Sequence, residues 1–253
     1  MRNRHGFTII EVSFFLAITG LIFLGVTIGV QNSIYRQRYN DSVQSFVEFL
    51  RGVYAQTTNV QNIEKGRTDK AIFGKLVTFG ESKNPLGDDN TDKAVFTYDV
   101  IGDVEGINES GGAQLQKLLN DRHADVMVEE SENGISKWKP AGIVESFIPK
   151  WSASIQNTKG APFKGTLLVV RHPRSGSVYT LFYDGVIEVN KSKNGNVLTS
   201  KLANFKLEDV DFCVTPDGLT GKKGRADVRI NRRATGSAGI ETYYDDNNKC
   251  DEE

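Results

Sequence analysis

The chain has 253 residues, of which 38% are hydrophobic and 25% are charged, and its formal net charge is −1. This balance argues against a protein that binds nucleic acid over its whole surface, but it is compatible with local basic patches. The length is enough for one well-buried domain besides a membrane segment.

The N-terminal segment carries the most specific signal in the chain. A short basic leader, Met1–Gly6, precedes an apolar stretch that begins at Phe7. Glu11 is charged, but no charged residue follows it from Val12 to Tyr35. About 20 apolar residues let a helix cross a bilayer, so we expect a transmembrane helix over residues 7–35. A carboxylate costs about 3 kcal/mol at the bilayer centre, so Glu11 needs a compensating partner.

Two ordinary interpretations of this segment explain less of it. A cleaved secretory signal has a shorter apolar core and a small-x-small cleavage site. A simple single-span anchor tolerates the length but gives the carboxylate of Glu11 no role.

The segment resembles the class III signal of type IV prepilins and type II secretion pseudopilins, with Gly6, Phe7 and Glu11 at matching positions. The resemblance covers only residues 1–30. It implies that a prepilin peptidase cleaves after Gly6 and that the new amino group of Phe7 is N-methylated. It also implies that Glu11 neutralises the terminal ammonium of a neighbouring subunit in a filament. The alternative is that Gly6 only separates the leader from the helix.

The apolar pattern continues beyond the membrane segment. Val43, Phe46, Val47, Leu50, Val53 and Tyr54 recur at three- and four-residue spacing without an intervening proline. This periodicity predicts one helix over residues 7–60, whose amphipathic second half lies against a globular head formed by residues 61–253. Gly20, Gly25 and Gly29 are candidate positions for close helix packing, and local loosening of the helix is the alternative interpretation.

The remaining chain favours strands. Short apolar pieces at 71–73, 76–79 and 94–100 alternate with polar segments, and 84–90 has the composition of an exposed loop. We expect a short helix over 114–128 that ends near Glu129, and irregular structure over 135–162. Residues 165–171 and 177–183 predict a hairpin, and 186–189 would add a third strand. Further strands are expected at 205–215, 225–230 and 240–244.

A long helix followed by an antiparallel sheet gives an α+β fold, which is the pilin architecture. The hairpin-rich second half also resembles minor pseudopilins with a two-sheet head. Two cysteines, Cys213 and Cys250, in an exported domain indicate one disulfide near the C-terminus, as the resemblance also implies. Two reduced structural cysteines are the alternative.

A run of basic residues precedes the acidic C-terminus. We call it the basic strip; it comprises Lys222, Lys223, Arg225, Arg229, Arg232 and Arg233. Such a strip could bind DNA phosphates or another anionic ligand. The favoured interpretation is a solvated strand face beside an acidic tail, because no aromatic residues are interleaved for base stacking.

Two weaker patterns predict no chemistry. Asp88, Asn90, Asp92 and Asp99 fit part of a calcium-loop template, but Lys93 stands where the template has glycine. His172 and Ser175 have no recognisable acid partner and are interpreted as turn residues. The sequence therefore predicts no metal, no cofactor and no catalytic residue.

The resulting hypothesis is a structural subunit, without enzymatic activity, of a type IV pilus or related filament. Its implied partners are other pilins, a prepilin peptidase and the inner-membrane assembly machinery. The precursor would span the bacterial cytoplasmic membrane with its N-terminus inside, and the assembled form would be an extracellular filament. Three alternatives stay open: a type II secretion pseudopilin, a DNA-capturing minor pilin and a membrane-anchored surface enzyme. Motility, adhesion, DNA uptake and secretion are not distinguished by this N-terminus.

Overall fold

The computed structural model describes ten stretches of the chain, which are residues 8–58, 70–81, 94–103, 119–120, 123–132, 135–172, 175–189, 195–216, 225–244 and 248–250. The chain divides into two compact units, Met1–Asp41 and Ser42–Glu253. Three parts of the predictions lie outside the described residues: the leader Met1–Gly6, Phe7, and the last two positions expected in the helix, 59–60.

Helix α1 runs from Ile9 to Thr58 and contains 50 residues. From Ser42 onward it belongs to the second unit, and its apolar side chains at three- and four-residue spacing are buried there: Val43, Phe46, Val47, Leu50, Val53 and Tyr54. At its C-terminal end the Thr58 carbonyl accepts a hydrogen bond of 2.8 Å from Arg171. This guanidinium satisfies one of the last carbonyls of the helix. The predicted amphipathic half is therefore confirmed.

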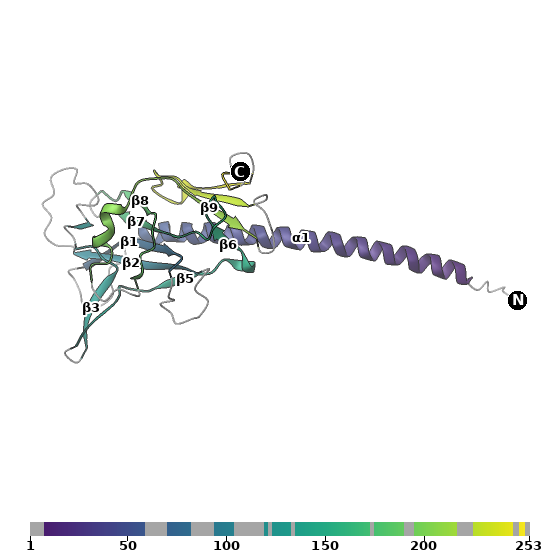
Figure 1. Ribbon diagram of the computed structural model, residues 1–253, viewed down its shortest axis with the longest axis horizontal. Helices are drawn as coiled ribbons and strands as arrows, with labels where there is room; N and C mark the ends of the chain where they lie inside the picture. The colour runs from purple at the N-terminus through teal and green to yellow at the C-terminus, as the bar shows by residue number, and fades with distance from the viewer. Residues whose placement is uncertain are drawn as a thin grey trace. The chain divides into compact units, whose positions relative to one another are not determined.

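The larger sheet has five strands in the order β5-β2-β1-β7-β8, and every neighbouring pair is antiparallel (Figure 1). Its strands are β1 (Lys70–Phe79), β2 (Val95–Asp103), β5 (Glu145–Phe147), β7 (Gly165–Arg171) and β8 (Val178–Tyr183). The predicted hairpin is confirmed as β7 and β8, and the predicted pieces at 71–73 and 76–79 form one continuous strand.

The second sheet has four antiparallel strands in the order β11-β10-β9-β6. They are β6 (Ser154–Gln156), β9 (Val210–Thr215), β10 (Ala226–Ile230) and β11 (Ile240–Tyr243). A separate hairpin pairs β3 (Met127–Glu132) with β4 (Ile135–Pro140). Short 3-10 turns cover Lys150–Ser152, Thr199–Asn204 and Ser237–Gly239. The α+β class is thus confirmed.

Phenylalanine rings join α1 to both sheets. The Phe46 ring lies 6.4 Å from that of Phe79 in β1, 5.8 Å from Phe147 in β5 and 5.4 Å from Phe212 in β9. The hydroxyl of Tyr54 is 2.7 Å from that of Thr180 in β8, so the helix carries a buried polar contact as well. Another core cluster includes Leu76, Tyr98, Leu168, Leu198, Leu202 and Phe205. Burial of these groups supplies the main driving force for folding the head.

Three local predictions differ from the structure. Of the helix expected over 114–128, residues 119–120 are helical, but the C-terminal part is wrong: His123 has a left-handed backbone (φ 49°) and β3 begins at Met127. The stretch 135–162 contains β4, β5 and β6 instead of irregular structure.

Residues 186–189 also do not form the predicted third strand of a meander. The hydroxyl of Thr166 donates to the Gly185 carbonyl and accepts from the Ile187 amide, so a side chain holds this backbone. At the edge of β8, Phe182 exchanges both backbone hydrogen bonds with Lys206. That position of the strand edge is therefore already occupied.

Candidate functional site: the N-terminal helix and the disulfide-linked sheet

Three hydrogen bonds between Thr8 and Glu11 cap the start of α1. The Thr8 amide and hydroxyl each donate to a Glu11 carboxylate oxygen at 2.9 Å, and the Glu11 amide donates to the Thr8 hydroxyl at 3.3 Å. This is a capping box, in which an N-cap hydroxyl and an acid three residues later satisfy each other's backbone donors. The carboxylate of Glu11 therefore has an intramolecular role that sequence reasoning missed, although the Thr-x-x-Glu pattern is visible in the sequence.

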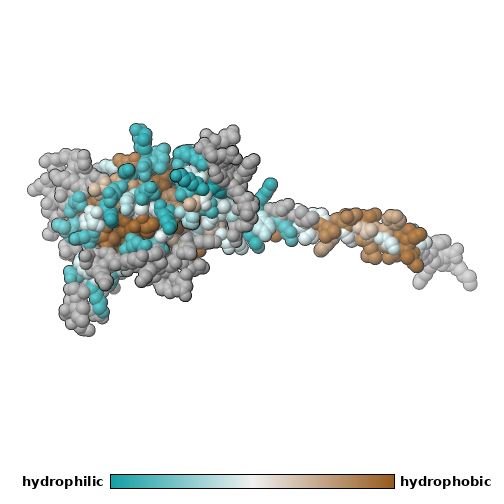
Figure 2. Space-filling model, in the orientation of Figure 1, coloured by the Kyte–Doolittle hydropathy of each residue, from teal (hydrophilic) through white to brown (hydrophobic). Residues whose placement is uncertain are grey.

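The first part of α1 is apolar and exposed. Ile9, Leu21 and Phe23 are 86%, 70% and 71% exposed, and Figure 2 shows this part of the helix as a hydrophobic surface. The helix is long and apolar enough to cross a membrane. An exposed apolar surface of this size marks a site that lipid or protein covers.

The three glycines of this segment lie at positions of the helix surface that no other described side chain covers. A methyl group at Gly20, Gly25 or Gly29 would meet no atom within 4 Å outside its immediate surroundings. Gly25 and Gly29 are four residues apart and therefore lie on one face of the helix. They are compatible with close packing of a second helix, which stays a prediction.

The two cysteines form the predicted disulfide. The Cys213 and Cys250 sulfur atoms are 2.02 Å apart, the bond spans 37 residues, and both side chains are fully buried. Cys213 is in β9, so the bridge fixes the described residues of the C-terminal segment to the middle of the second sheet. Asn248 adds to this attachment, because its side-chain amide donates to the Arg225 carbonyl.

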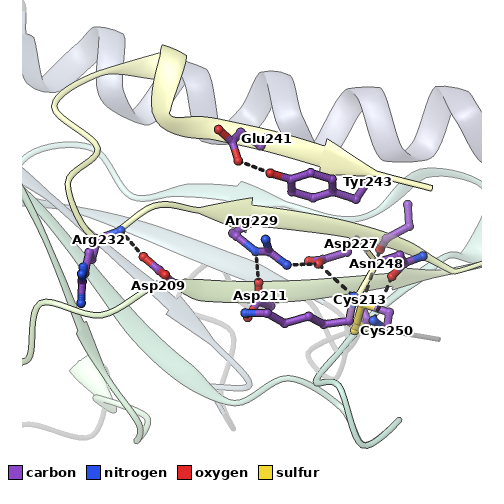
Figure 3. A network of polar contacts seen from close by, with 12 residues as sticks. Asp209, Asp211, Cys213, Asp227, Arg229, Arg232, Glu241, Tyr243, Asn248 and Cys250 are labelled. Carbon is purple, nitrogen blue, oxygen red and sulfur yellow. Dashed lines mark hydrogen bonds and ion pairs between the residues drawn. A yellow bond between two sulfur atoms is a disulfide. The ribbon is translucent and has the colours of Figure 1, made fainter. Parts of the chain in front are cut away.

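A charged cluster lies beside the disulfide on β9 and β10 (Figure 3). Arg229 donates to Asp211 at 2.5 Å and to Asp227 at 2.8 Å, and Lys249 pairs with Asp211 at 2.8 Å. Burial, with a smaller contribution from Asp211, raises the pKa of Asp227 above its usual range, while Lys249 and Arg229 oppose the rise. The guanidinium of Arg229 also lies 4.7 Å from the Tyr243 ring, and the Tyr243 hydroxyl donates to Glu241.

The basic strip is therefore not one exposed surface among the described residues. Arg225 is buried, Arg229 is engaged by two aspartates, and Lys222 and Lys223 lie outside the described residues. Arg232 and Arg233 are exposed, and the Arg232 backbone amide donates to Asp209. The interpretation as a solvated strand face is wrong for Arg225, which is buried, and for Arg229, because alternation in the strand did not reveal the two aspartates that pair with Arg229.

The remaining candidate residues that the structure describes are Asp99, His172 and Ser175. Asp99 is buried and pairs with Lys75 at 2.6 Å, while Asp88, Asn90 and Asp92 lie outside the described residues. His172 accepts a hydrogen bond from the Ser175 amide at its Nδ1 atom, which agrees with a turn. Within the described ranges, no group of three His, Cys, Asp or Glu side chains is placed to hold a metal ion.

The described surface has small hollows. One, of about 170 Å³, lies between the end of β1 and β6, and its lining has no ionisable side chain: Phe79, Gly80, Ala94, Val95, Ser154, Ile155, Gln156, Pro162 and Phe163. This hollow presents no acid–base or nucleophilic group to a bound molecule.

The fold and its sites define an α+β protein with an N-terminal helix long and apolar enough to cross a membrane and a head that contains one disulfide. No family model matches the chain, and comparisons with curated proteins and with solved structures gave no match.

Proposed function

We propose that the chain is a prepilin-like structural subunit. In this proposal, α1 anchors the precursor in the cytoplasmic membrane, a prepilin peptidase removes residues 1–6, and the mature chain polymerises through α1 into a type IV pilus or related filament. One observation carries the proposal: the sequence motif Gly6–Glu11 stands at the start of the apolar segment, and α1, which begins at Ile9, exposes its apolar side chains up to Tyr35. Lipid would cover that surface before assembly, and neighbouring helices would cover it afterwards.

The division of α1 supports this interpretation. Its residues from Ser42 onward are amphipathic and contribute to the core of the head. The residues from Val12 to Tyr35 carry no charge. One helix can therefore serve both as a polymerisation element and as the support of a folded head. Type II secretion pseudopilins share these features and are included in the proposal.

The arginines argue against DNA capture by the basic strip. Since Arg225 is buried and Arg229 is held by Asp211 and Asp227, the described part of the strip offers phosphates only Arg232 and Arg233 as exposed guanidinium groups. The affinity for DNA increases with each phosphate charge that the protein neutralises, so two exposed arginines should bind DNA only weakly.

Co-expression with a prepilin peptidase tests the proposal. We expect peptidase-dependent loss of residues 1–6 and a mature N-terminus at Phe7 carrying an N-methyl group, both measured by mass spectrometry of the intact chain. The matched control is Gly6→Leu, which leaves the apolar helix intact but places a bulky side chain at the cleavage site. An intact Met1 in the presence of active peptidase, or cleavage beyond Val30, would contradict the proposal.

A further inference from the structure

The turn that connects the two sheets presents apolar side chains to solvent. It runs from Ile148 to Ser152, between β5 and β6, and we call it the tryptophan turn. Ile148 is 51% exposed and Trp151 is 53% exposed, with Lys150 exposed between them. Pro149 and Ala153 are buried, so the turn is anchored on both sides of its exposed residues.

The backbone of this turn is strained. Trp151 has φ 56° and ψ 37°, and Ser152 has φ 58°, so two successive residues with side chains adopt the left-handed region. Glycine or asparagine reaches this region at lower cost than a bulky aromatic residue. The surrounding fold holds the turn, because the Ser42 hydroxyl donates to the Lys150 carbonyl at 3.0 Å and the Ala153 amide donates to it at 3.2 Å. Strain that a fold maintains around an exposed side chain points to a use for that side chain.

Few residues separate the apolar segment from the helix residue that contacts the tryptophan turn. Ser42, which contacts the turn, follows Tyr35 by seven residues. Seven residues span at most about 25 Å when fully extended. The turn thus stays within reach of the boundary of a membrane that the apolar segment spans. The intervening residues include Arg36 and Arg38 against one acid, Asp41.

We propose that the tryptophan turn is a second membrane contact of the anchored subunit. Trp151 and Ile148 enter the interface between lipid and water, while the Lys150 ammonium lies at the level of anionic phosphate headgroups. Tryptophan prefers this interface because its ring is apolar and its N–H needs a polar partner, and lysine extends its charged end toward the headgroups. This inference rests on the membrane-spanning part of the proposed function.

The chain offers a direct optical test, because it contains two tryptophans, Trp138 and Trp151. The variant Trp138→Phe retains only Trp151 as a fluorophore, and Trp151→Phe retains only Trp138, which lies in β4 and whose ring packs against Gly195. Each full-length variant is reconstituted into phosphatidylcholine–phosphatidylglycerol vesicles with brominated acyl chains, which quench a nearby indole. Far-UV circular dichroism checks that both variants are folded.

We expect at least twofold quenching and a blue-shifted emission for Trp151 in these vesicles, compared with unbrominated lipid and with detergent, respectively. Trp138 should be quenched much less. Lys150→Gln in the Trp138→Phe background should reduce the quenching in anionic vesicles but not in pure phosphatidylcholine.

The outcomes separate the inference from the proposed function. A chain that fails to float with vesicles would contradict the membrane-spanning helix and this inference with it. A chain that floats, with Trp151 quenched no more than Trp138, would contradict the membrane contact and leave the proposed function intact. A blue shift of Trp151 that occurs only in assembled filaments would instead identify the turn as a contact with a second copy of the chain.

Discussion

Arg229 compensates the charge of two aspartates in the second sheet. Its guanidinium donates to Asp211 and to Asp227, and the side chain of Asp227 is completely inaccessible to solvent. Removing one partner of a buried ionic cluster leaves the other charges uncompensated, which typically costs about 3–5 kcal/mol. Arg229→Ala should therefore lower the free energy of unfolding of the head by an amount in this range, measured by urea denaturation of the full chain in detergent.

Arg232→Ala is the matched control for this substitution. Arg232 is exposed, and its backbone amide donates a hydrogen bond to Asp209 that alanine retains. We expect its effect to stay within about 0.5 kcal/mol. Equal unfolding midpoints for Arg229→Ala and Arg232→Ala would show that the cluster contributes nothing beyond surface charge.

Asp125 gives the head a specific pH dependence. The side chain is buried, and burial raises its pKa from 3.8 to about 6, although its Oδ1 atom accepts hydrogen bonds from the Val126 and Met127 amides. Between about pH 4 and pH 6 the folded state keeps a proton that the unfolded state has released. The stabilisation that comes from this raised pKa is fully present below pH 4 and is lost as the pH rises through 6. The free energy of unfolding should fall over this range by about 3 kcal/mol at most.

Asp125→Asn removes this titration and isolates its effect. The stability of wild type minus that of the variant should decrease between pH 4 and pH 7, measured by urea denaturation at each pH. Parallel stability profiles across this range would contradict a raised pKa at Asp125.

At the scale of elements, the disulfide restricts the segment that runs from β9 to the residues after β11. Its 37-residue separation corresponds to about 4 kcal/mol of restraint on the unfolded chain in the chain-entropy model. Replacing Cys213 and Cys250 together by alanine should lower the free energy of unfolding by about this amount, again by urea denaturation. The control is the wild-type chain in reducing agent, which should approach the double variant. Unchanged stability after verified reduction would contradict this role.

The elements that the sequence predicts correctly are those whose pattern is local. The three- and four-residue apolar spacing of α1 and the alternation in β10 follow from the helix and strand periods alone. The β7–β8 hairpin follows from two β-rich runs around a turn. The stretch 186–189 was predicted wrongly because a side chain of β7, Thr166, and the distant Lys206 decide its pairing.

The same distinction applies to the candidate site. The box formed by Thr8 and Glu11 involves residues three positions apart, so the sequence contains it. The pairing of Arg229 with Asp211 depends on these residues being directly opposite in β9 and β10, 18 positions apart in the chain. Strand register of this kind is set by tertiary packing and not by composition, so alternation alone indicated a solvated face.

At the scale of the whole molecule, the proposed assembly and the folding of the head would depend on different residues of α1. Among the described residues of the helix, burial begins at Ser42, whereas Glu11 is exposed and hydrogen-bonds to Thr8. A filament of such subunits would bring each Glu11 close to the amino terminus of a neighbour, where a carboxylate and an ammonium in an apolar surrounding attract strongly. Changes at Glu11 should therefore affect polymerisation without altering the stability of the head.

Two substitutions at Glu11 separate its capping role from its charge. Glu11→Ala removes both, whereas Glu11→Gln keeps an oxygen that can accept from the Thr8 amide, since glutamine also serves in a capping box. If the intersubunit charge pair governs assembly, both variants should be processed and inserted, with wild-type head stability, yet form few filaments, because an unmatched buried ammonium costs several kcal/mol. Electron microscopy and sedimentation of sheared filaments measure this. Wild-type filament yield with glutamine and loss only with alanine would assign Glu11 to the start of its own helix, and the neighbour's ammonium would then need another partner.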